Sequence, residues 1–468
     1  MKLKRFGLAT APLVLFSVWG CQNYSHSTAL PTPGMRFQAA STDLQQALRE
    51  RLAQLSPTGD LGFFTQPESH ELHKIPQDPK NPLTPAKVQL GQLLFHDSLL
   101  GVKSAVPQTQ QTYSCASCHH AKAGFQAGIR QGVGDGGQGF GRQGEGRFPL
   151  LAPQQLDVQP VRTPSAMNTA WQPNMLWNGQ FGARGLNQNT QALWSAERFE
   201  NSTLFGGGGI ENNKLGFDGV ETQALVGQDV HRLALQGVQD NRAYQRYFAQ
   251  AYPDLPAQER ITPVTAALAI AAFERTILSN RAPFQQWLKG RSEALNTQAL
   301  RGASLFFGKA NCVQCHTGPA LNSMRFEGLG LKDLTGADIV GSNPQADQHL
   351  GRASFTGSPE DRYHFKVPQL YNLADVSHYG HGGSLRTLAD GGAYLNRGVP
   401  ENPQVPAQQL SPFFKPLGLS AAEQQDLVYF LEYGLRDPEL MRYQPAQLPS
   451  GSCVPNHDAL SRQQLGCS

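Results

Sequence analysis

Apolar residues recur with a helical period in two separated stretches of the chain, one ending in GQLLF (Gly91–Phe95) and the other in GASLF (Gly302–Phe306). A helix-start signal precedes each stretch: Thr84, which stands before a proline, and Asn296, which stands before a threonine. We therefore expect a helix in each place, and the shared pattern indicates that the chain repeats itself.

A third apolar run, at the N-terminus, has a different character. The basic stretch MKLKR is followed by the mostly apolar residues 6–20, a run that is short for a membrane span and typical of an export signal. It ends in VWGCQ, which resembles a bacterial lipobox. Two interpretations remain: lipidation at Cys21, which would anchor the chain to the outer membrane, or ordinary cleavage a few residues later. Both predict export to the periplasm, and no later segment looks like a membrane helix.

Composition and charge narrow the class of protein. The 468 residues include 39 Lys and Arg against 36 Asp and Glu, so the net charge gives no case for binding nucleic acid. With 48 Gly, 32 Pro and only 16% charged residues, the chain is expected to form compact helices joined by long, turn-rich loops.

Six of the seven cysteines fall into pairs. Cys453 and Cys467 would form a disulfide in an oxidising compartment. The other four lie in two C-x-x-C-H motifs, a spacing typical of haem c attachment by two thioether bonds, with the histidine as proximal iron ligand. Zinc sites or disulfides are the alternatives, but zinc needs a second ligand pair that neither segment supplies cleanly. The motifs comprise Cys115, Cys118 and His119, and Cys312, Cys315 and His316.

The motifs belong to a longer internal repeat. PSAMNTAWQPNMLWNG (Pro164–Gly179) aligns without gaps with PQLYNLADVSHYGHGG (Pro368–Gly383), and this alignment pairs Trp177 with His381. We therefore expect two related haem lobes with a seam near residue 290. The predicted segments are a signal peptide (1–21), an N-terminal extension (22–80), a first haem lobe (81–290), a second haem lobe (291–447) and a C-terminal tail with the disulfide (448–468).

From about Leu83 to Arg397 the chain resembles the bacterial di-haem cytochrome c peroxidases and their MauG-like relatives. The resemblance implies a mostly α protein of two cytochrome c-like haem lobes with long irregular loops, whose haems face one another across the lobe interface. It also implies that the first lobe is peroxidatic, reacting with hydrogen peroxide, and that the second transfers electrons. The stretches that carry it are NPLTPAKVQLGQLLFHD, CASCH, RTPSAMNTAW, LWNG, AAFERTI, RGASLFFGKANCVQCHTGP and GRASFTGSPEDRYHFKVPQLYN.

The chain departs from this family at the first iron. The classical peroxidases close this iron at rest with a loop histidine, but here no histidine lies between His120 and His231. We expect His120 to lie at the surface and the iron to keep an open position, as in MauG-like proteins and as peroxide binding requires. Met167 and Met175 are alternative ligands, although methionine more often fills apolar cores.

Peroxide cleavage needs a group that moves a proton from one oxygen to the other. Gln223, in ETQALVGQDVHRL, matches the glutamine of the family's distal motif, and His231 stands where its catalytic glutamate would fall. A neutral histidine could shuttle the proton, with Arg232 stabilising the developing anion. A long insertion precedes this motif, so Glu197 or Glu200 is the alternative source of the group, and His231 would then be a solvated surface residue.

Two further positions matter for electron transfer. Trp177 matches the tryptophan that lies between the haems of this family, which implies an electron relay; the alternative is core packing. For the second iron the resemblance implies a Met or Tyr eight residues past Thr387, where this chain has Leu395, which cannot ligate iron. Tyr394 lies one residue earlier and is the candidate ligand after a shift of register; an unusual ligand or none is the alternative.

Calcium is not favoured by the sequence. Arg162 aligns with the asparagine that binds the inter-haem calcium of this family, and a cation at that position argues against a second one.

Three functions are compatible with these features. The first is a peroxidase that reduces hydrogen peroxide with electrons from a small periplasmic redox protein, a c-type cytochrome or a cupredoxin. The second is a MauG-like oxidase of a protein substrate, and the third is a plain di-haem electron carrier. The open first iron and Trp177 argue against the carrier, and the sequence names no protein substrate. We therefore predict a peroxidase with two covalently bound haems c and with Trp177, Gln223 and His231 as catalytic residues.

Overall fold

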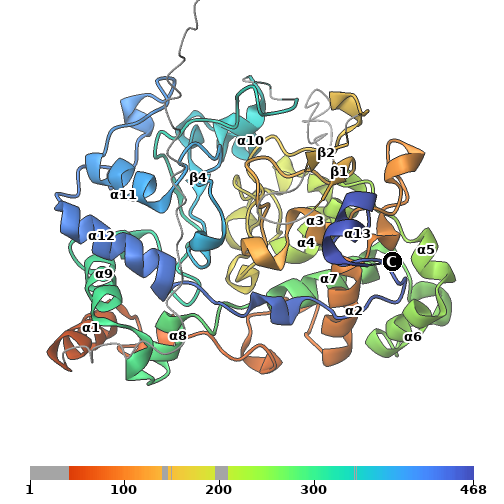
Figure 1. Ribbon diagram of the computed structural model, residues 1–468, viewed down its shortest axis with the longest axis horizontal. Coiled ribbons are helices and arrows are strands. Elements are labelled where there is room, and N and C mark those ends of the chain that lie inside the picture. The colour runs from red at the N-terminus through yellow and green to blue at the C-terminus, as the bar shows by residue number, and fades with distance from the viewer. Residues whose placement is uncertain are drawn as a thin grey trace, which may run out of the picture. The chain divides into compact units, whose positions relative to one another are not determined.

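Helices and irregular loops make up nearly all of the described structure (Figure 1). This computed structural model describes residues 42–139, 146–148, 150–195, 209–341, 343 and 345–467. The predicted signal segment with Cys21, and the alternative acid–base residues Glu197 and Glu200, lie outside these ranges. In the part of the chain that is described, no helix has the length and apolar character that crossing a membrane would need.

The prediction of a mostly α protein with long irregular loops is confirmed. The strands are two-residue pieces in two antiparallel pairs, β1 (Gly137–Gln138) with β2 (Gly146–Arg147) and β3 (Phe326–Glu327) with β4 (Phe365–Lys366). The α-helices are α1 (Thr42–Leu55), α2 (Pro85–His96), α3 (Cys115–Cys118), α4 (Gly219–Val230), α5 (Gln236–Asp240), α6 (Arg242–Ala251), α7 (Pro263–Arg275), α8 (Pro283–Leu288), α9 (Thr297–Phe307), α10 (Ala353–Thr356), α11 (Leu388–Arg397), α12 (Ala421–Tyr429) and α13 (Ala459–Leu465).

The first group of helices is built around the crossing of α2 and α7. Thr84 caps α2 by accepting a hydrogen bond from the backbone of Lys87 at 3.2 Å, as its position before a proline predicts. A Cβ atom at Gly91 would stand 1.8 Å from the carbonyl oxygen of Ala269 in α7, so only glycine allows this close crossing. Helices α4 and α6 pack against α7 and α2, to the right in Figure 1.

A second group repeats this design with α9 and α12. Asn296 caps α9 by accepting from the backbone of Ala299 at 2.9 Å. A Cβ atom at Gly302 would stand 2.0 Å from the carbonyl oxygen of Asp426 in α12. The glycines of GQLLF and GASLF thus serve the same purpose in the two halves. Helices α11 and α1 pack onto this pair, to the left in Figure 1.

The backbone follows the internal repeat after the motifs as well. Asn168 and Asn372 both adopt the left-handed conformation, with φ of 56° and 57°, and each precedes a short 3₁₀ turn. Gly179 and Gly383 also match, with φ of 67° and 61°. Such agreement at positions with positive φ indicates that the two segments share one local fold.

The C-terminal tail returns to the first motif. The predicted disulfide between Cys453 and Cys467 is confirmed. Just after Cys453, Asn456 accepts a hydrogen bond from the hydroxyl of Ser117 within α3 at 2.6 Å, and the backbone of His457 donates to Thr112 at 2.9 Å. The tail therefore supports the turn that carries the first cysteine pair.

Candidate haem-binding active site

The first C-x-x-C-H motif forms a single helical turn. Cys115 and Cys118 are the ends of α3, and neither cysteine forms a disulfide. His119 follows, with Nδ1 3.1 Å from the carbonyl oxygen of Phe125. Burial lowers the pKa of His119 to about 4, so its ring is neutral at physiological pH. Because a carbonyl can only accept, Nδ1 carries the proton and Nε2 keeps the lone pair that an iron ligand needs.

The second motif has the same chemistry. Cys312 and Cys315 are free thiols, and burial raises their pKa values to about 12 and about 11. Nδ1 of His316 lies 3.1 Å from the carbonyl oxygens of both Leu321 and Pro368, and burial lowers the pKa of this ring to about 4. The imidazole is again neutral, with the lone pair on Nε2.

Each motif lines its own cavity, and both cavities are walled largely by apolar side chains. The first, of about 100 Å³, contains Cys115, Cys118 and His119 in its wall. The second, of about 350 Å³, contains Cys312, Cys315 and His316. Two cysteines outside any disulfide, a neutral imidazole with its Nε2 lone pair available and an apolar enclosure are what a haem c requires. The residues present therefore fit one such group in each cavity.

Polar side chains also enter the first cavity, from α4 and α7. The side-chain oxygen of Gln223 is buried and has no hydrogen-bond partner within the described ranges. Glu274 lines the same cavity from α7, where burial and the charge of Glu221 raise its pKa to about 8, so this carboxyl is mostly protonated at neutral pH.

His231 caps the C-terminal end of α4 and faces this cavity. Its Nδ1 lies 2.8 Å from Oδ2 of Asp157, which lines the cavity as well. Burial lowers the pKa of His231, but the charge of Asp157 and the hydrogen bond to it outweigh burial, so the pKa lies above its ordinary value. The structure thus brings Gln223 and His231 to the cavity of the first motif.

Other predicted residues lie elsewhere. Arg232 donates to Asp135 and to the carbonyl of Gln155, each at 2.6 Å, and is not among the residues lining the first cavity, so it does not face a developing anion there. The prediction that His120 lies at the surface is wrong, because its side chain is buried beside the motif.

The two methionines considered as iron ligands fill apolar space. Met167 is buried in the main core, and Met175 packs with Phe181 and Val220 in a smaller cluster. Neither lines the first cavity.

Trp177 lies where the two halves of the repeat meet. Its Nε1 donates to the carbonyl oxygen of Arg162 at 2.7 Å, and its ring centre is 6.4 Å from that of His381. Trp177 lines the second cavity, while its neighbour Leu176 lines both cavities. The indole is therefore held beside the wall that the two cavities share.

Equivalent residues of the repeat exchange hydrogen bonds at this contact. The backbone of Arg162 donates to the carbonyl of His381 at 2.7 Å, and that of Lys366, the repeat equivalent of Arg162, donates to the carbonyl of Trp177 at 2.8 Å. The same backbone hydrogen bond thus forms in both directions between the two halves, as expected for a local two-fold axis.

Two cations are buried next to this contact. The guanidinium of Arg162 donates to the carbonyls of Ile129 and Ala127 and to the side-chain oxygen of Gln126, at 3.0 to 3.2 Å. These oxygens thus already surround a positive charge. Lys366 lines the second cavity, and burial lowers its pKa to about 7.

Tyr394 and Leu395 occupy adjacent positions on α11, whose N-cap is Thr387. Tyr394 is 2% exposed and lines the second cavity, where its hydroxyl donates to the carbonyl of Leu329 at 2.6 Å. Leu395 also reaches the cavity but is 38% exposed. Helix α11 is continuous over Leu388–Arg397 and turns the phenol inward.

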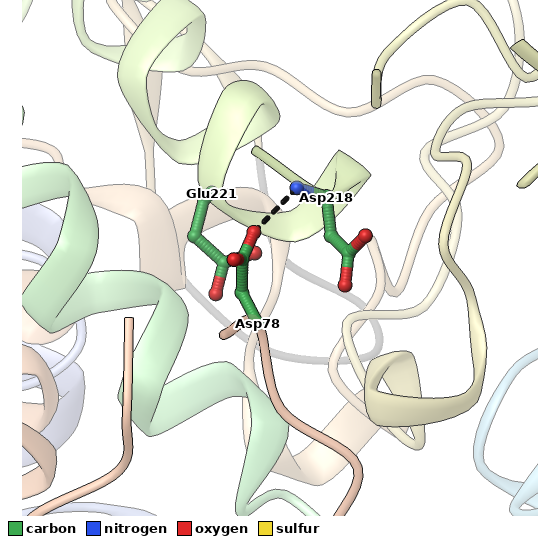
Figure 2. A group of neighbouring side chains, drawn as sticks. All are labelled: Asp78, Asp218 and Glu221. Atoms are coloured by element: carbon green, nitrogen blue, oxygen red, sulfur yellow. Dashed lines mark hydrogen bonds between the residues drawn. The ribbon is translucent and has the colours of Figure 1, made fainter. Parts of the chain in front are cut away.

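Asp78, Asp218 and Glu221 form a cluster of carboxylates (Figure 2), and none of the three lines either cavity. Their oxygens are close enough to hold a metal ion. However, Arg275 binds Glu221 at 2.7 Å and Asp218 at 3.3 Å, and Arg184 binds Asp78 at 3.0 Å. Two guanidinium groups therefore balance the cluster, which ties the segment before α2 to α4 and α7.

Sequence reasoning missed three groups that line the cavities: Asp157, Glu274 and Lys366. Glu274 and Lys366 lie inside stretches quoted for the family resemblance, AAFERTI and GRASFTGSPEDRYHFKVPQLYN, so their positions were available but not their burial. Asp157 lies in a loop with no motif, and no local signal could have found it.

Comparisons with known proteins agree with this geometry. Residues 85–293 match the family model described as di-haem cytochrome c peroxidase. The chain is 29% identical to the methylamine utilization protein MauG of Methylorubrum extorquens, covering 91% of this chain and 95% of that protein. It is 27% identical to the cytochrome c551 peroxidase of Nitrosomonas europaea, covering 67% and 74%.

A solved structure shares the fold. It is a MauG-like protein associated with microbial copper homeostasis, 25% identical, with a TM-score of 0.55 over 80% of this chain and 97% of that one. The resemblance read from the sequence motifs is thus confirmed. Residues 85–293 are thus similar to the di-haem cytochrome c peroxidases, and most of the chain is similar to MauG and to proteins named as cytochrome c peroxidases, which are oxidoreductases.

Proposed function

We propose that the protein is a di-haem c-type peroxidase that reduces hydrogen peroxide to water with electrons from a small periplasmic redox protein. The observation that carries the proposal is the composition of the first cavity. It combines a cysteine pair and a neutral histidine with Gln223 and with the hydrogen-bonded pair of His231 and Asp157. A plain electron carrier has no need of a proton-transferring side chain beside its iron.

Cys115, Cys118 and His119 would hold a haem c, which would supply a redox-active iron for peroxide in this cavity. His231 accepts at Nε2 the proton of one peroxide oxygen and returns it to the other oxygen, which departs as water when the O–O bond breaks. Gln223 offers an amide for hydrogen bonding to peroxide in the same cavity. Two electrons from the donor protein and two protons from solvent balance the conversion of one peroxide to two waters.

Electrons reach the first cavity by way of the second. Cys312, Cys315 and His316 would hold the second haem, and Trp177 lines the same cavity beside the shared wall. A large aromatic ring at that point shortens the distance that an electron must cross between the two groups. Export to the periplasm, with lipidation at Cys21 as an open alternative, would bring the chain to a c-type cytochrome or cupredoxin donor.

A MauG-like oxidase of a protein substrate is the second candidate. The observation that favours it is Tyr394, a buried phenol in the wall of the second cavity. Tyrosine as an axial haem ligand favours the oxidised iron, which suits storage of oxidising equivalents better than transfer of electrons from a donor.

Steady-state turnover of hydrogen peroxide separates these candidates. We expect the purified holoprotein to oxidise a reduced small c-type cytochrome or a reduced cupredoxin in proportion to the peroxide consumed. Absence of turnover with both donors, together with peroxide-dependent oxidation of aromatic side chains in an added protein, would favour the MauG-like candidate instead.

Two haems per chain are expected, because each motif offers two cysteines outside any disulfide and a neutral histidine. A pyridine haemochrome assay should give two haems c per polypeptide, retained on denaturing gels. Cys312→Ala with Cys315→Ala should leave one, and Cys453→Ala, which removes a disulfide partner instead, should leave two. One haem or none in the wild-type protein would refute the proposal.

Trp177→Phe is expected to slow the peroxide-driven oxidation of the second haem while both haem spectra stay almost unchanged. Phenylalanine keeps apolar volume but loses the larger indole ring and its hydrogen bond to Arg162. Stopped-flow absorption would measure the rate. Trp171→Phe is the matched control, since Trp171 packs against a small apolar cluster with Leu278. Equal rates in the two variants would assign Trp177 to packing alone.

A further inference from the structure

The pair formed by Asp157 and His231 joins two parts of the chain that are far apart in sequence. Oδ2 of Asp157 lies 2.8 Å from Nδ1 of His231, across a separation of 74 residues. The Asp157 carboxylate is only 9% exposed. Its backbone is fixed as well, since its N–H donates to the carbonyl of Asp135 at 2.9 Å and its carbonyl accepts from Gly134 at 2.8 Å.

The loop is shaped to hold this carboxylate. A Cβ atom at Gly134 would stand 2.4 Å from Oδ2 of Asp157, closer than any side chain tolerates. Glycine at this position therefore leaves the room in which the carboxylate meets the histidine.

A carboxylate beside one ring nitrogen decides the state of the other. An ionised carboxylate can only accept, so Nδ1 of His231 must carry the proton and Nε2 must carry the lone pair. Because Nδ1 is hydrogen-bonded to Asp157, Nε2 is the nitrogen that can accept a proton from peroxide in the cavity that His231 lines. The same negative charge stabilises the imidazolium that forms when Nε2 takes up a proton.

We propose that Asp157 is a positioning residue for His231, which fixes the histidine with its Nε2 lone pair available to peroxide and strengthens it as a base. The inference rests on the proposed function, because it assigns a partner to the proton-transferring group of that reaction. The proton passes from one peroxide oxygen to Nε2 and on to the other oxygen, while the proton on Nδ1 stays between His231 and Asp157 throughout.

Other charged and titratable groups face His231. Glu274, His119 and Tyr113 share its cavity, from α7, the first motif and the segment before it. Arg232 is adjacent, and its charge lowers the pKa of His231, but Arg232 is itself bound to Asp135.

One more ion pair lies nearby. Asp229, two residues before His231, pairs with Lys103, and its side chain is 87% exposed. Asp157 is therefore the carboxylate in direct contact with the histidine ring.

The test is the pH dependence of two reactions of the first haem in the holoprotein, with peroxide and with cyanide. Cyanide enters as the neutral acid and must lose a proton on binding, so its rate reports the base without any turnover. In the wild type both rates should rise with pH through the pKa of His231, which lies above its ordinary value. In Asp157→Asn the carboxylate no longer offsets the effect of burial on the pKa of His231, so this pKa should fall. The rise of both rates should then move to lower pH, and both plateau rates should fall about 10- to 100-fold.

Three further variants show whether Asp157 acts through His231. Asp157→Glu keeps the charge and should restore the position of the rise. Asp229→Asn removes an exposed charge two residues from His231 and should change nothing. Asp157→Asn introduced into His231→Gln should have no further effect, because its action depends on the imidazole.

The outcomes separate this inference from the proposed function. Absence of peroxide turnover in the wild type would refute the peroxidase proposal, and cyanide binding would still decide the role of Asp157. An unchanged pH dependence of cyanide binding in Asp157→Asn would overturn the inference and leave the peroxidase proposal standing. A loss of equal size in the His231→Gln background would also overturn it, since Asp157 would then act on the fold.

Discussion

His231→Ala is expected to slow the reaction of the holoprotein with hydrogen peroxide by about 100-fold or more, because alanine removes the nitrogen that moves the proton between the two oxygens. The first haem should still attach, since His231 takes no part in the cysteine motif. Stopped-flow absorption of the haem after mixing with peroxide would measure the rate. The effect should be largest above the pKa of His231, which lies above its ordinary value, because only the neutral ring can accept a proton at Nε2.

His70→Ala is the matched control, because His70 is exposed and lies outside both cavities. Its rate should equal that of the wild type. The competing source of the proton-transferring group is the insertion before α4, which carries Glu197 and Glu200. A normal rate in His231→Ala, together with a loss in Glu197→Gln or Glu200→Gln, would transfer the role to a carboxylate of the insertion.

The residues that sequence could predict are those whose chemistry is set by near neighbours. Two cysteines and a histidine within five positions define a haem attachment motif whatever the rest of the fold is. In both motifs the histidine is hydrogen-bonded to the backbone carbonyl of a residue close in sequence. The helices before them were also predictable, because the cap and the apolar period are local. Gly91 and Gly302 could also be recognised as equivalent positions of the repeat, but their role in the close helix crossings could not be predicted.

The remaining features depend on contacts between distant segments. Asp157 meets His231 across 74 residues, and no periodicity links a loop carboxylate to a helix cap. The error at His120 has the same origin: a histidine beside a motif reads as polar and exposed, but the chain around it buries the ring. The repeat paired Trp177 with His381 in sequence, yet only the folded chain brings these two rings to 6.4 Å from each other.

Tyr394→Phe is expected to change the spin state of the second iron. Tyr394 is 2% exposed on α11 and lines the cavity of Cys312, Cys315 and His316. We propose that its phenol oxygen would become a ligand of the iron of a haem held by Cys312, Cys315 and His316, giving up its hydrogen bond to Leu329. The wild-type protein at rest should then show one high-spin and one low-spin signal in electron paramagnetic resonance. Phenylalanine fills the same space without an oxygen, so the low-spin signal should disappear while both haems remain attached.

Tyr379→Phe is the control for this change. Tyr379 lines the same cavity, and its hydroxyl donates to two backbone carbonyls, those of Leu373 and Val376, at 3.0 and 2.9 Å. The hydroxyl of Tyr394 donates to one, that of Leu329. Both signals should persist in this variant and in Leu395→Ala. Persistence of the low-spin signal in Tyr394→Phe would show that another group ligates the second iron.

The same spectrum bears on which of the two reactions the protein performs. In the part of the chain that is described, neither Met167 nor Met175 lines the first cavity, and His231 is held by Asp157. The first iron should therefore be high-spin and bind cyanide without prior reduction. Two low-spin signals at rest would contradict this open position, and with it a peroxidase that needs no reductive activation. A high-spin first iron together with a tyrosine-ligated second iron would favour the MauG-like candidate. A tyrosine ligand makes the second iron harder to reduce. Such an iron is better suited to withdrawing electrons from a protein substrate than to passing on electrons from a weakly reducing donor.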